Sequence, residues 1–233
     1  MRLLEFCAET VPRPRQLLVK RTAVWVFLAV LTLLTASALL FDDTLLMVDR
    51  PISDAIRGWG DLDTWRAVSF LGATEFYVPV ALVASVLLWN RCRSLALTWP
   101  LLIGVAAIVN VVTKALVGRP RPDFPDTGVA LASYPSGHTI HATIVLGLIP
   151  PTLYLLTHRS LSAWISYPLL LAAAIVTGLS RVALGAHWLT DVIAGHLIGL
   201  FLLVAADLVV EYHRHDAYPR LERLHPQRWP SRV

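Results

Sequence analysis

Residues 97–117 read LTWPLLIGVAAIVNVVTKALV, an apolar run with one charged side chain, Lys114. A helix needs about 20 apolar residues to cross the roughly 30 Å hydrocarbon core of a bilayer. The run therefore predicts a membrane-spanning helix. The composition agrees, because 56% of the 233 residues are hydrophobic and 15% are charged, whereas roughly 25% of residues are charged in soluble domains. The mean hydropathy is +0.61.

Five further apolar runs predict the rest of the fold. We place the spans at about 22–41, 76–89, 97–117, 139–156, 164–179 and 188–210. The predicted class is all-α: a six-helix membrane domain at 22–211, an N-terminal tail at 1–21 and a C-terminal tail at 212–233 that we expect to be irregular. The first run contains Ala36-Ser37-Ala38, which resembles a signal-peptide cleavage site. It is longer than the roughly 7–15 residues of a signal-peptide core, so we expect it to remain as a span.

Basic residues indicate the orientation of the six helices. They cluster in the two tails and in the loops after the second and fourth spans, four segments that share one side of a six-span protein. The positive-inside rule makes this side, and both termini, cytoplasmic. It also accounts for the net charge of +4 without a nucleic-acid partner. Lys114, Arg119, Arg121 and Arg181 lie on the outer, extracytoplasmic side against this rule, which suggests that they serve chemistry.

The first outer segment, 42–75, is rich in aspartate and has apolar residues at helical spacing. It fits two descriptions equally well. One is an interfacial helix with Trp59 and Trp65 near the lipid headgroups, and the other is a packed loop.

The chain has two cysteines, Cys7 and Cys92, and both fall in segments that we place in the cytoplasm. A disulfide is not expected there. Neither cysteine has a partner at metal-ligand spacing, so we expect both to be inert.

Three polar clusters lie at the outer ends of the third to sixth spans. Polar and ionisable groups at membrane depth are costly, and for that reason they are usually functional. The clusters are Lys114 with Arg121-Pro122, then Pro135-Ser136-Gly137-His138, and then Ser180-Arg181 with His187 and Asp191.

The first two clusters and Arg181 predict a phosphate site. Lys114, Arg121 and Arg181 supply enough positive charge to bind a dianionic phosphate, and the two arginines can do so with two donors each. Ser136 and Gly137 precede a helix, whose first amides attract anions. Gly137 lets the backbone approach closely, and the Ser136 hydroxyl can donate to a phosphate oxygen.

Two histidines add reactivity to this site. His187 and Asp191 are four residues apart, so they share one face of a helix. Asp191 can accept a hydrogen bond from one ring nitrogen and leave the other as a nucleophile. His138, from another helix, can protonate a leaving oxygen. Two histidines and three cations without a carboxylate cluster do not favour a metal site.

Read together, the clusters are KxxxxxxRP, PSGH and SRxxxxxHxxxD, complete and in order between Lys114 and Asp191. They resemble the three motifs of the type 2 phosphatidic acid phosphatase (PAP2) superfamily. The resemblance implies a nucleophile at His187 that forms phospho-histidine, oriented by Asp191. It implies that His138 acts first as acid and then as base, without a metal cofactor. It also implies a phosphate surrounded by Lys114, Arg121, Ser136, Gly137, His138 and Arg181, at the outer ends of helices three to six.

The substrate stays open at this stage. Short loops favour a lipid-anchored phosphate, and the candidates are a polyprenyl diphosphate carrier, phosphatidic acid and phosphatidylglycerol phosphate. The outward-facing site favours the carrier. Two other functions are weighed: vanadate-dependent haloperoxidase chemistry, which occurs in soluble proteins with the same motifs, and headgroup binding by a transporter or flippase, for which a His187–Asp191 pair is superfluous. The oligomeric state is not indicated.

Other polar residues near the clusters have simpler structural explanations. Arg119 could offer another contact to a phosphate or headgroup, but a solvated charge of its loop is the simpler expectation. We expect Asp123 and Asp126 to pair with the loop arginines. The hydrogen-bonded interior residues that we expect are Asn110, His141 and His196.

Overall fold

The computed structural model describes residues 14–122, 132–157 and 160–224, and every regular element in these ranges is helical. In chain order the helices are α1 (Pro14–Leu40), α2 (Asp42–Arg57), α3 (Leu62–Ser69), α4 (Thr74–Leu88), α5 (Arg93–Val117), α6 (Gly137–Thr157), α7 (Ser160–Ala183) and α8 (Leu189–Leu224), with a short 3-10 helix, η1 (Phe70–Gly72), before α4.

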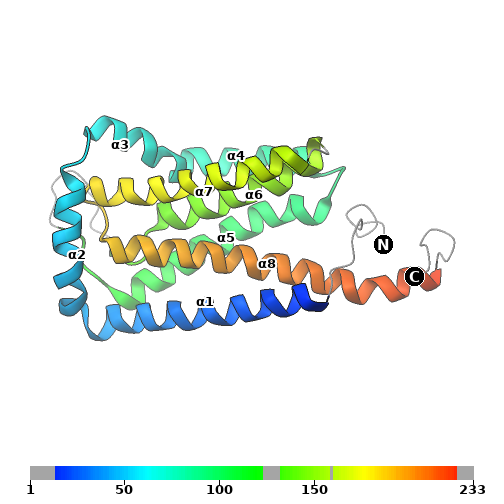
Figure 1. Ribbon diagram of the computed structural model, residues 1–233, viewed down its shortest axis with the longest axis horizontal. Helices are drawn as coiled ribbons and strands as arrows, with labels where there is room; N and C mark the ends of the chain where they lie inside the picture. Colours follow the sequence, from blue (N-terminus) through cyan, green and yellow to red (C-terminus); the bar gives the residue numbers. More distant parts are fainter. Residues whose placement is uncertain (1–13, 123–131, 158–159, 225–233) are drawn as a thin grey trace.

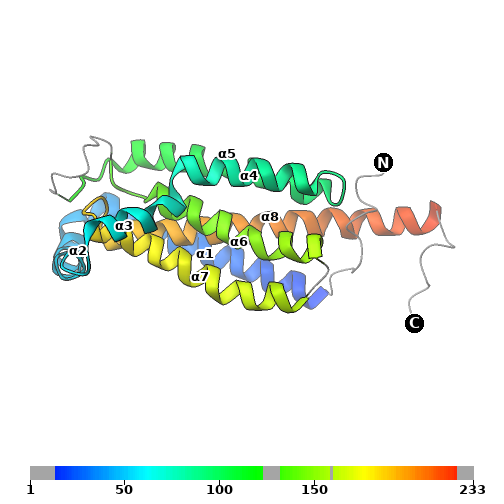
Figure 2. The ribbon, with the colours of Figure 1, turned by 90° about the horizontal axis from the view of Figure 1, so that it is seen from above.

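The long helices α1 and α4 to α8 run side by side as one bundle (Figure 1, Figure 2). Six described stretches are long and apolar enough to cross a membrane: Arg21–Leu40, Leu62–Leu88, Arg93–Val117, Gly137–Thr157, Ile165–Ala183 and Leu189–Val209. The predicted six-span all-α fold is thereby confirmed. The second stretch begins earlier than predicted, because α3, η1 and α4 follow one another almost without interruption.

Helix α6 is the centre of the bundle. In its most apolar 18 residues 61% are buried, against 33% or less in the other five spans. Its sequence has no Lys, Arg, Asp or Glu, and Ile140, Ile144 and Leu148 recur one helical turn apart to form the main core with Trp99 of α5. The first half of α6 is therefore packed on most sides, which matters because its first residues carry the PSGH motif.

Helix α2 crosses one end of the bundle, opposite the start of α1 and the end of α8 (Figure 1). This confirms a helix within 42–75 rather than a packed loop. Its buried positions are Leu46, Asp49, Ser53 and Ile56, which share one face at helical spacing. That face contacts α1, α7 and α8. Two of these four buried side chains, Asp49 and Ser53, are polar, and buried polar groups require hydrogen-bond partners.

Two sequence predictions about other parts of the chain are wrong. Helix α8 continues to Leu224, so the chain is not irregular from 212 onward. Cys92 takes part in a disulfide, so it is not an inert thiol. Cys7, the other cysteine of the chain, lies outside the described residues, as do Asp123 and Asp126.

Candidate active site

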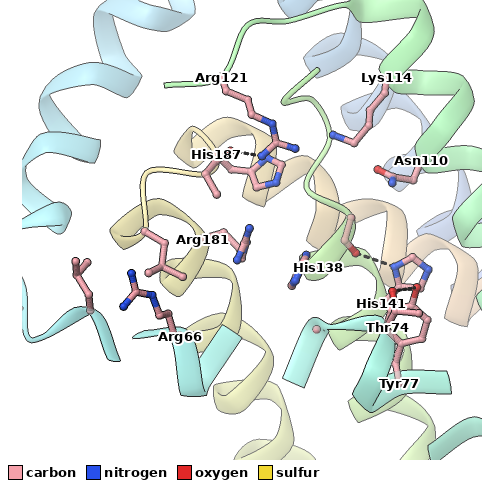
Figure 3. A pocket seen from close by; sticks show the side chains of 15 residues that line it. Arg66, Thr74, Tyr77, Asn110, Lys114, Arg121, His138, His141, Arg181 and His187 are labelled. Atoms are coloured by element: carbon pink, nitrogen blue, oxygen red, sulfur yellow. Dashed lines mark hydrogen bonds between the residues drawn. The ribbon is translucent and has the colours of Figure 1, made fainter. Parts of the chain in front are cut away.

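A cavity of about 440 Å³ opens at the end of the bundle that α2 crosses. Its wall combines residues from α3 to α7 with the loops before α6 and α8. The described lining side chains include Arg66, Thr74, Tyr77, Asn110, Lys114, Arg121, His138, His141, Arg181 and His187 (Figure 3).

The three predicted phosphate-binding cations meet in this cavity. Lys114 Nζ donates to the carbonyls of Ala132 and Ser133, the latter at 3.2 Å. Arg121 Nη1 donates to the carbonyl of Ala186 at 2.7 Å. Arg181 comes from α7.

Arg121 and Arg181 have different hydrogen-bond partners. Arg181 Nη1 donates to Ser69 Oγ at 2.6 Å, while its buried Nε has no hydrogen-bond partner among the described residues. Burial lowers the pKa of Arg121, although Asp191 opposes the shift. Three cations so close together repel one another, so a bound anion would relieve a real electrostatic cost.

His187 lies in the loop between α7 and α8 and lines the cavity, so it does not share a helix face with Asp191 as predicted. Its backbone N–H donates to the carbonyl of Arg181 at 3.2 Å, which ties the nucleophile candidate to one of the cations. Burial lowers the pKa of His187 to about 4, although the Asp191 carboxylate opposes the shift. The ring is therefore neutral near pH 7, as a nucleophile requires.

Asp191 lies behind His187, wholly buried and away from the cavity wall. Its Oδ2 is 3.6 Å from His187 Nδ1, which is longer than a hydrogen bond. The predicted hydrogen bond is therefore not formed, and Nδ1 has no hydrogen-bond partner among the described residues. The same oxygen accepts from the backbone N–H of Trp188 at 2.9 Å. An acidic residue in the first turn of α8 thus satisfies the amide that precedes the helix.

The PSGH motif divides between the cavity and the interior. Gly137 and His138 line the cavity. A Cβ on Gly137 would lie 2.9 Å from Asn110 Nδ2, so a larger residue would require the Asn110 side chain to move. Ser136 is wholly buried and does not line the cavity; its backbone N–H donates to the Asp191 carbonyl at 3.1 Å, and its Oγ accepts from Thr139. Its role as a phosphate ligand stays a prediction.

The expectation for Arg119 is wrong. Gly118 adopts a φ of +63° and ends α5, which is a common helix end. The next side chain, Arg119, turns inward and is fully buried instead of solvated. It donates to Asp191 Oδ1 at 2.8 Å and to Asp49 Oδ2 at 2.9 Å. These carboxylates raise the pKa of Arg119 despite its burial.

Other residues of the cavity had no motif to mark them. Arg66 of α3 brings a fourth cation to the wall, where it pairs with Asp63 at 2.9 Å. Asn110 lies in the wall with its buried Oδ1 unpartnered among the described residues, so the expected helix–helix hydrogen bond of that atom is absent. Its position four residues before Lys114 was the available signal.

His141 and His196, which we expected in the interior, are each hydrogen-bonded, as predicted. His196 Nδ1 is 2.9 Å from Thr143 Oγ1. His141 Nδ1 is 2.8 Å from the carbonyl of Gly137, and its ring stacks on Tyr77 with centroids 4.2 Å apart. His141 also lines the cavity, so it supports the wall as well as the core.

This arrangement suits attack on a phosphate. A neutral histidine and a second histidine face one cavity with three cations around it (Figure 3). Cations neutralise the oxygens that gain charge in the transition state, and the two imidazoles supply a nucleophile and a proton donor.

Comparison with known proteins gives an independent result. The family model described as the PAP2 superfamily matches residues 95–214. The chain is 31% identical over 147 residues to phosphatidylglycerophosphatase B of Bacillus subtilis. The aligned stretch covers 60% of this chain and 70% of that protein. It is also 31% identical over 133 residues to undecaprenyl-diphosphatase of Sulfolobus acidocaldarius, and this stretch covers 54% of this chain and 60% of that protein.

A solved structure is similar as well. It is the crystal structure of a transmembrane PAP2-type phosphatidylglycerolphosphate phosphatase from Bacillus subtilis, with a TM-score of 0.73 and 27% identity. The match covers 79% of this chain and 94% of that one.

Proposed function

The chain belongs to the PAP2 superfamily, and from this premise we propose that it removes a phosphate from a membrane lipid through a phospho-histidine at His187. It is an integral membrane protein and a PAP2-type phosphatase, a type that is metal-independent. One observation carries the mechanism: His187 and His138 line one cavity together with Lys114, Arg121 and Arg181.

The proposed reaction has two steps. In the first, the free ring nitrogen of His187 forms a bond to phosphorus while the bond to the leaving oxygen breaks, and protonated His138 gives that oxygen its proton. In the second, neutral His138 takes a proton from water, whose oxygen attacks phosphorus as the P–N bond breaks. Inorganic phosphate leaves, and both histidines return to their starting protonation states. Lys114, Arg121 and Arg181 bind the phosphate oxygens throughout.

We propose a lipid diphosphate as the preferred substrate, with a polyprenyl diphosphate as its most suitable form. Arg66 supports this choice, because it adds a fourth cation to the wall. A terminal monophosphate engages three cations, whereas a diphosphate carries a second phosphate group for a fourth. Phosphatidic acid and phosphatidylglycerol phosphate are the alternatives, and the relatives carry names from both groups.

A phosphate-release panel with purified protein tests the substrate. We expect release from all three lipids, with kcat/KM highest for the polyprenyl diphosphate. Arg66→Ala should lower kcat/KM for the diphosphate about tenfold and for the monophosphates less than threefold, in the range of one charge-assisted hydrogen bond. Arg50→Ala is the matched control, since Arg50 is exposed on α2 and does not line the cavity. Equal losses on all substrates would contradict the diphosphate assignment.

The same panel separates the alternatives. A transporter or flippase would bind the lipids without releasing phosphate. Haloperoxidase chemistry would require peroxidase activity with added vanadate, and the membrane-spanning fold does not favour it because those enzymes are soluble. We expect vanadate to inhibit phosphate release instead, as an analogue of the five-coordinate phosphorus.

We propose that the cavity opens on the extracytoplasmic side. Basic residues at the start of α1, in the turn between α4 and α5 and at the end of α8 support this, since these parts lie at the opposite end of the bundle from α2. The disulfide at Cys92 argues the other way, because disulfides are rare in the cytoplasm. We give the charge pattern of the four basic segments of the sequence more weight than the single disulfide at Cys92.

Thiol labelling of whole cells tests the orientation. In a chain whose own cysteines are replaced by serine, Asp54→Cys on the exposed face of α2 should react with a membrane-impermeant maleimide. Asn90→Cys, exposed in the turn between α4 and α5, should react only after permeabilisation. The reverse pattern would overturn the proposed orientation and leave the chemistry untouched.

A further inference from the structure

We propose that Arg119 is a positioning residue: together with Asp49 of α2 it holds Asp191, and through Asp191 it orients His187. The inference rests on the proposed role of His187 as nucleophile. It gives α2 a role in catalysis, although none of the residues that line the cavity comes from this helix.

The contacts of Arg119 carry this inference. Its Nη1 donates to Asp191 Oδ1 at 2.8 Å and to Thr190 Oγ1 at 2.7 Å, and its Nη2 donates to Asp49 Oδ2 at 2.9 Å. Its Nε donates to Asp42 Oδ1 at 2.7 Å. All three guanidinium nitrogens are therefore used, and the side chain is fully buried. Only the planar fork of arginine can hold three carboxylates in fixed directions; a lysine ammonium cannot.

Asp191 depends on this arginine. Its carboxylate is wholly buried and accepts hydrogen bonds from the Trp188 N–H and from Arg119. A buried carboxylate that loses its cation is costly, and it moves or takes up a proton to avoid that cost. Arg119 holds Oδ1 and Trp188 holds Oδ2, so the carboxylate is fixed on both sides and Oδ2 stays 3.6 Å from His187 Nδ1.

Asp49 fixes the same region from the side of α2. It is wholly buried, and its carboxylate accepts from Arg119 and from the Thr190 backbone N–H at 3.0 Å. It therefore holds the first turn of α8, one residue before Asp191. Asp42 is the outermost partner, with 28% of its side chain exposed, so we expect it to matter least.

A double-mutant cycle with Asp191 tests the proposal. Arg119→Lys keeps the charge and loses the fork; we expect it to lower kcat about 100-fold with KM changed less than threefold, because Lys114, Arg121 and Arg181 still bind the phosphate. Asp191→Asn should lower kcat at least as much. If Arg119 acts through Asp191, the double variant loses no more than Asp191→Asn alone. Losses that multiply would overturn the proposal.

Controls separate positioning from folding. The concentration of sites is measured by vanadate titration, so that kcat refers to folded protein. Asp49→Asn should lower kcat about tenfold at unchanged KM, and Asp43→Asn, exposed on the same helix, should have no effect. A merely structural Arg119 would reduce the number of sites and leave kcat per site unchanged, which is the result that contradicts our assignment.

A readout without turnover distinguishes this inference from the proposed function. Ring ¹⁵N shifts of His187, assigned by their loss in His187→Ala, report the tautomer. We expect the Nδ1–H tautomer in the wild type and a mixture in Arg119→Lys. Unchanged shifts would overturn the positioning role even in an active enzyme. A shifted tautomer in a protein that releases no phosphate would retain it and reject the proposed function.

Discussion

His187→Ala is expected to abolish phosphate release, with a fall in kcat of about 10⁵-fold or more, because the reaction loses the atom that bonds to phosphorus. The alanine leaves the cations of the cavity in place, so binding of vanadate or phosphate should persist. In the wild type, radioactive phosphate from a labelled substrate should appear on the protein in an acid-labile, base-stable form. The variant should carry none.

The control for this loss is another buried histidine. His196→Gln can keep the hydrogen bond to Thr143 and does not line the cavity, so we expect activity within about threefold of the wild type. Full activity of folded His187→Ala protein would exclude the phospho-histidine. Loss of activity together with loss of the fold would be visible at once as loss of phosphate binding.

The spans could be predicted because hydrophobic length is a local property. Each predicted run coincides with a helical stretch to within a few residues, except where α3 and η1 extend the second span toward Leu62. The segment 62–75 is too polar to be assigned from hydropathy alone. It completes the span because α3 packs on α7, a tertiary contact that no local pattern encodes.

The cavity residues could be predicted because chemistry confines them to motifs. Lys114, Arg121, His138 and Arg181 lie at three helix ends of one membrane face, and the structure brings them together with His187. A six-span topology places these helix ends on one face of the membrane, and the packing of α5, α7 and α8 around α6 brings them together.

Arg119 shows where this reasoning fails. Its neighbours in the sequence are Gly118 and Pro120, which indicate only a loop, whereas its partners Asp42 and Asp49 are 77 and 70 residues away. The useful signal was already present: Arg119 breaks the positive-inside rule as clearly as Arg121 does. Asp42 and Asp49 lie on the inward face of the amphipathic helix α2, and a buried carboxylate requires a cation. Together these two signals would have predicted that Arg119 is buried beside them.

Arg66 and Asn110 mark a second limit. Neither belongs to a motif, and Arg66 reaches the cavity only because α3 packs on α7. Residues that select among substrates are placed by such packing rather than by the demands of the reaction. The preference for one lipid is therefore less accessible from the sequence than the chemistry.

His138→Ala is expected to trap the phospho-enzyme. With p-nitrophenyl phosphate, whose leaving group needs no protonation, the first step should proceed, whereas hydrolysis of phospho-His187 lacks its base. A burst of p-nitrophenol close to one equivalent per site should be followed by a slow steady state. With phosphatidic acid, whose alkoxide leaving group needs a proton, the first step itself should slow by about 10²–10⁴-fold, the usual contribution of general acid catalysis.

The matched control lies on the same helix. His141→Gln changes another cavity histidine, one that has no assigned proton transfer, and it should show steady turnover without a burst. Rapid-quench measurement of labelled protein should then find phosphate on most His138→Ala sites and on few His141→Gln sites. Linear product release from His138→Ala would mean that another group activates the water. In that case Arg121 and Arg181 would still bind the phosphate, but the two-histidine mechanism would be wrong, because a base that can be removed without slowing hydrolysis is not the base.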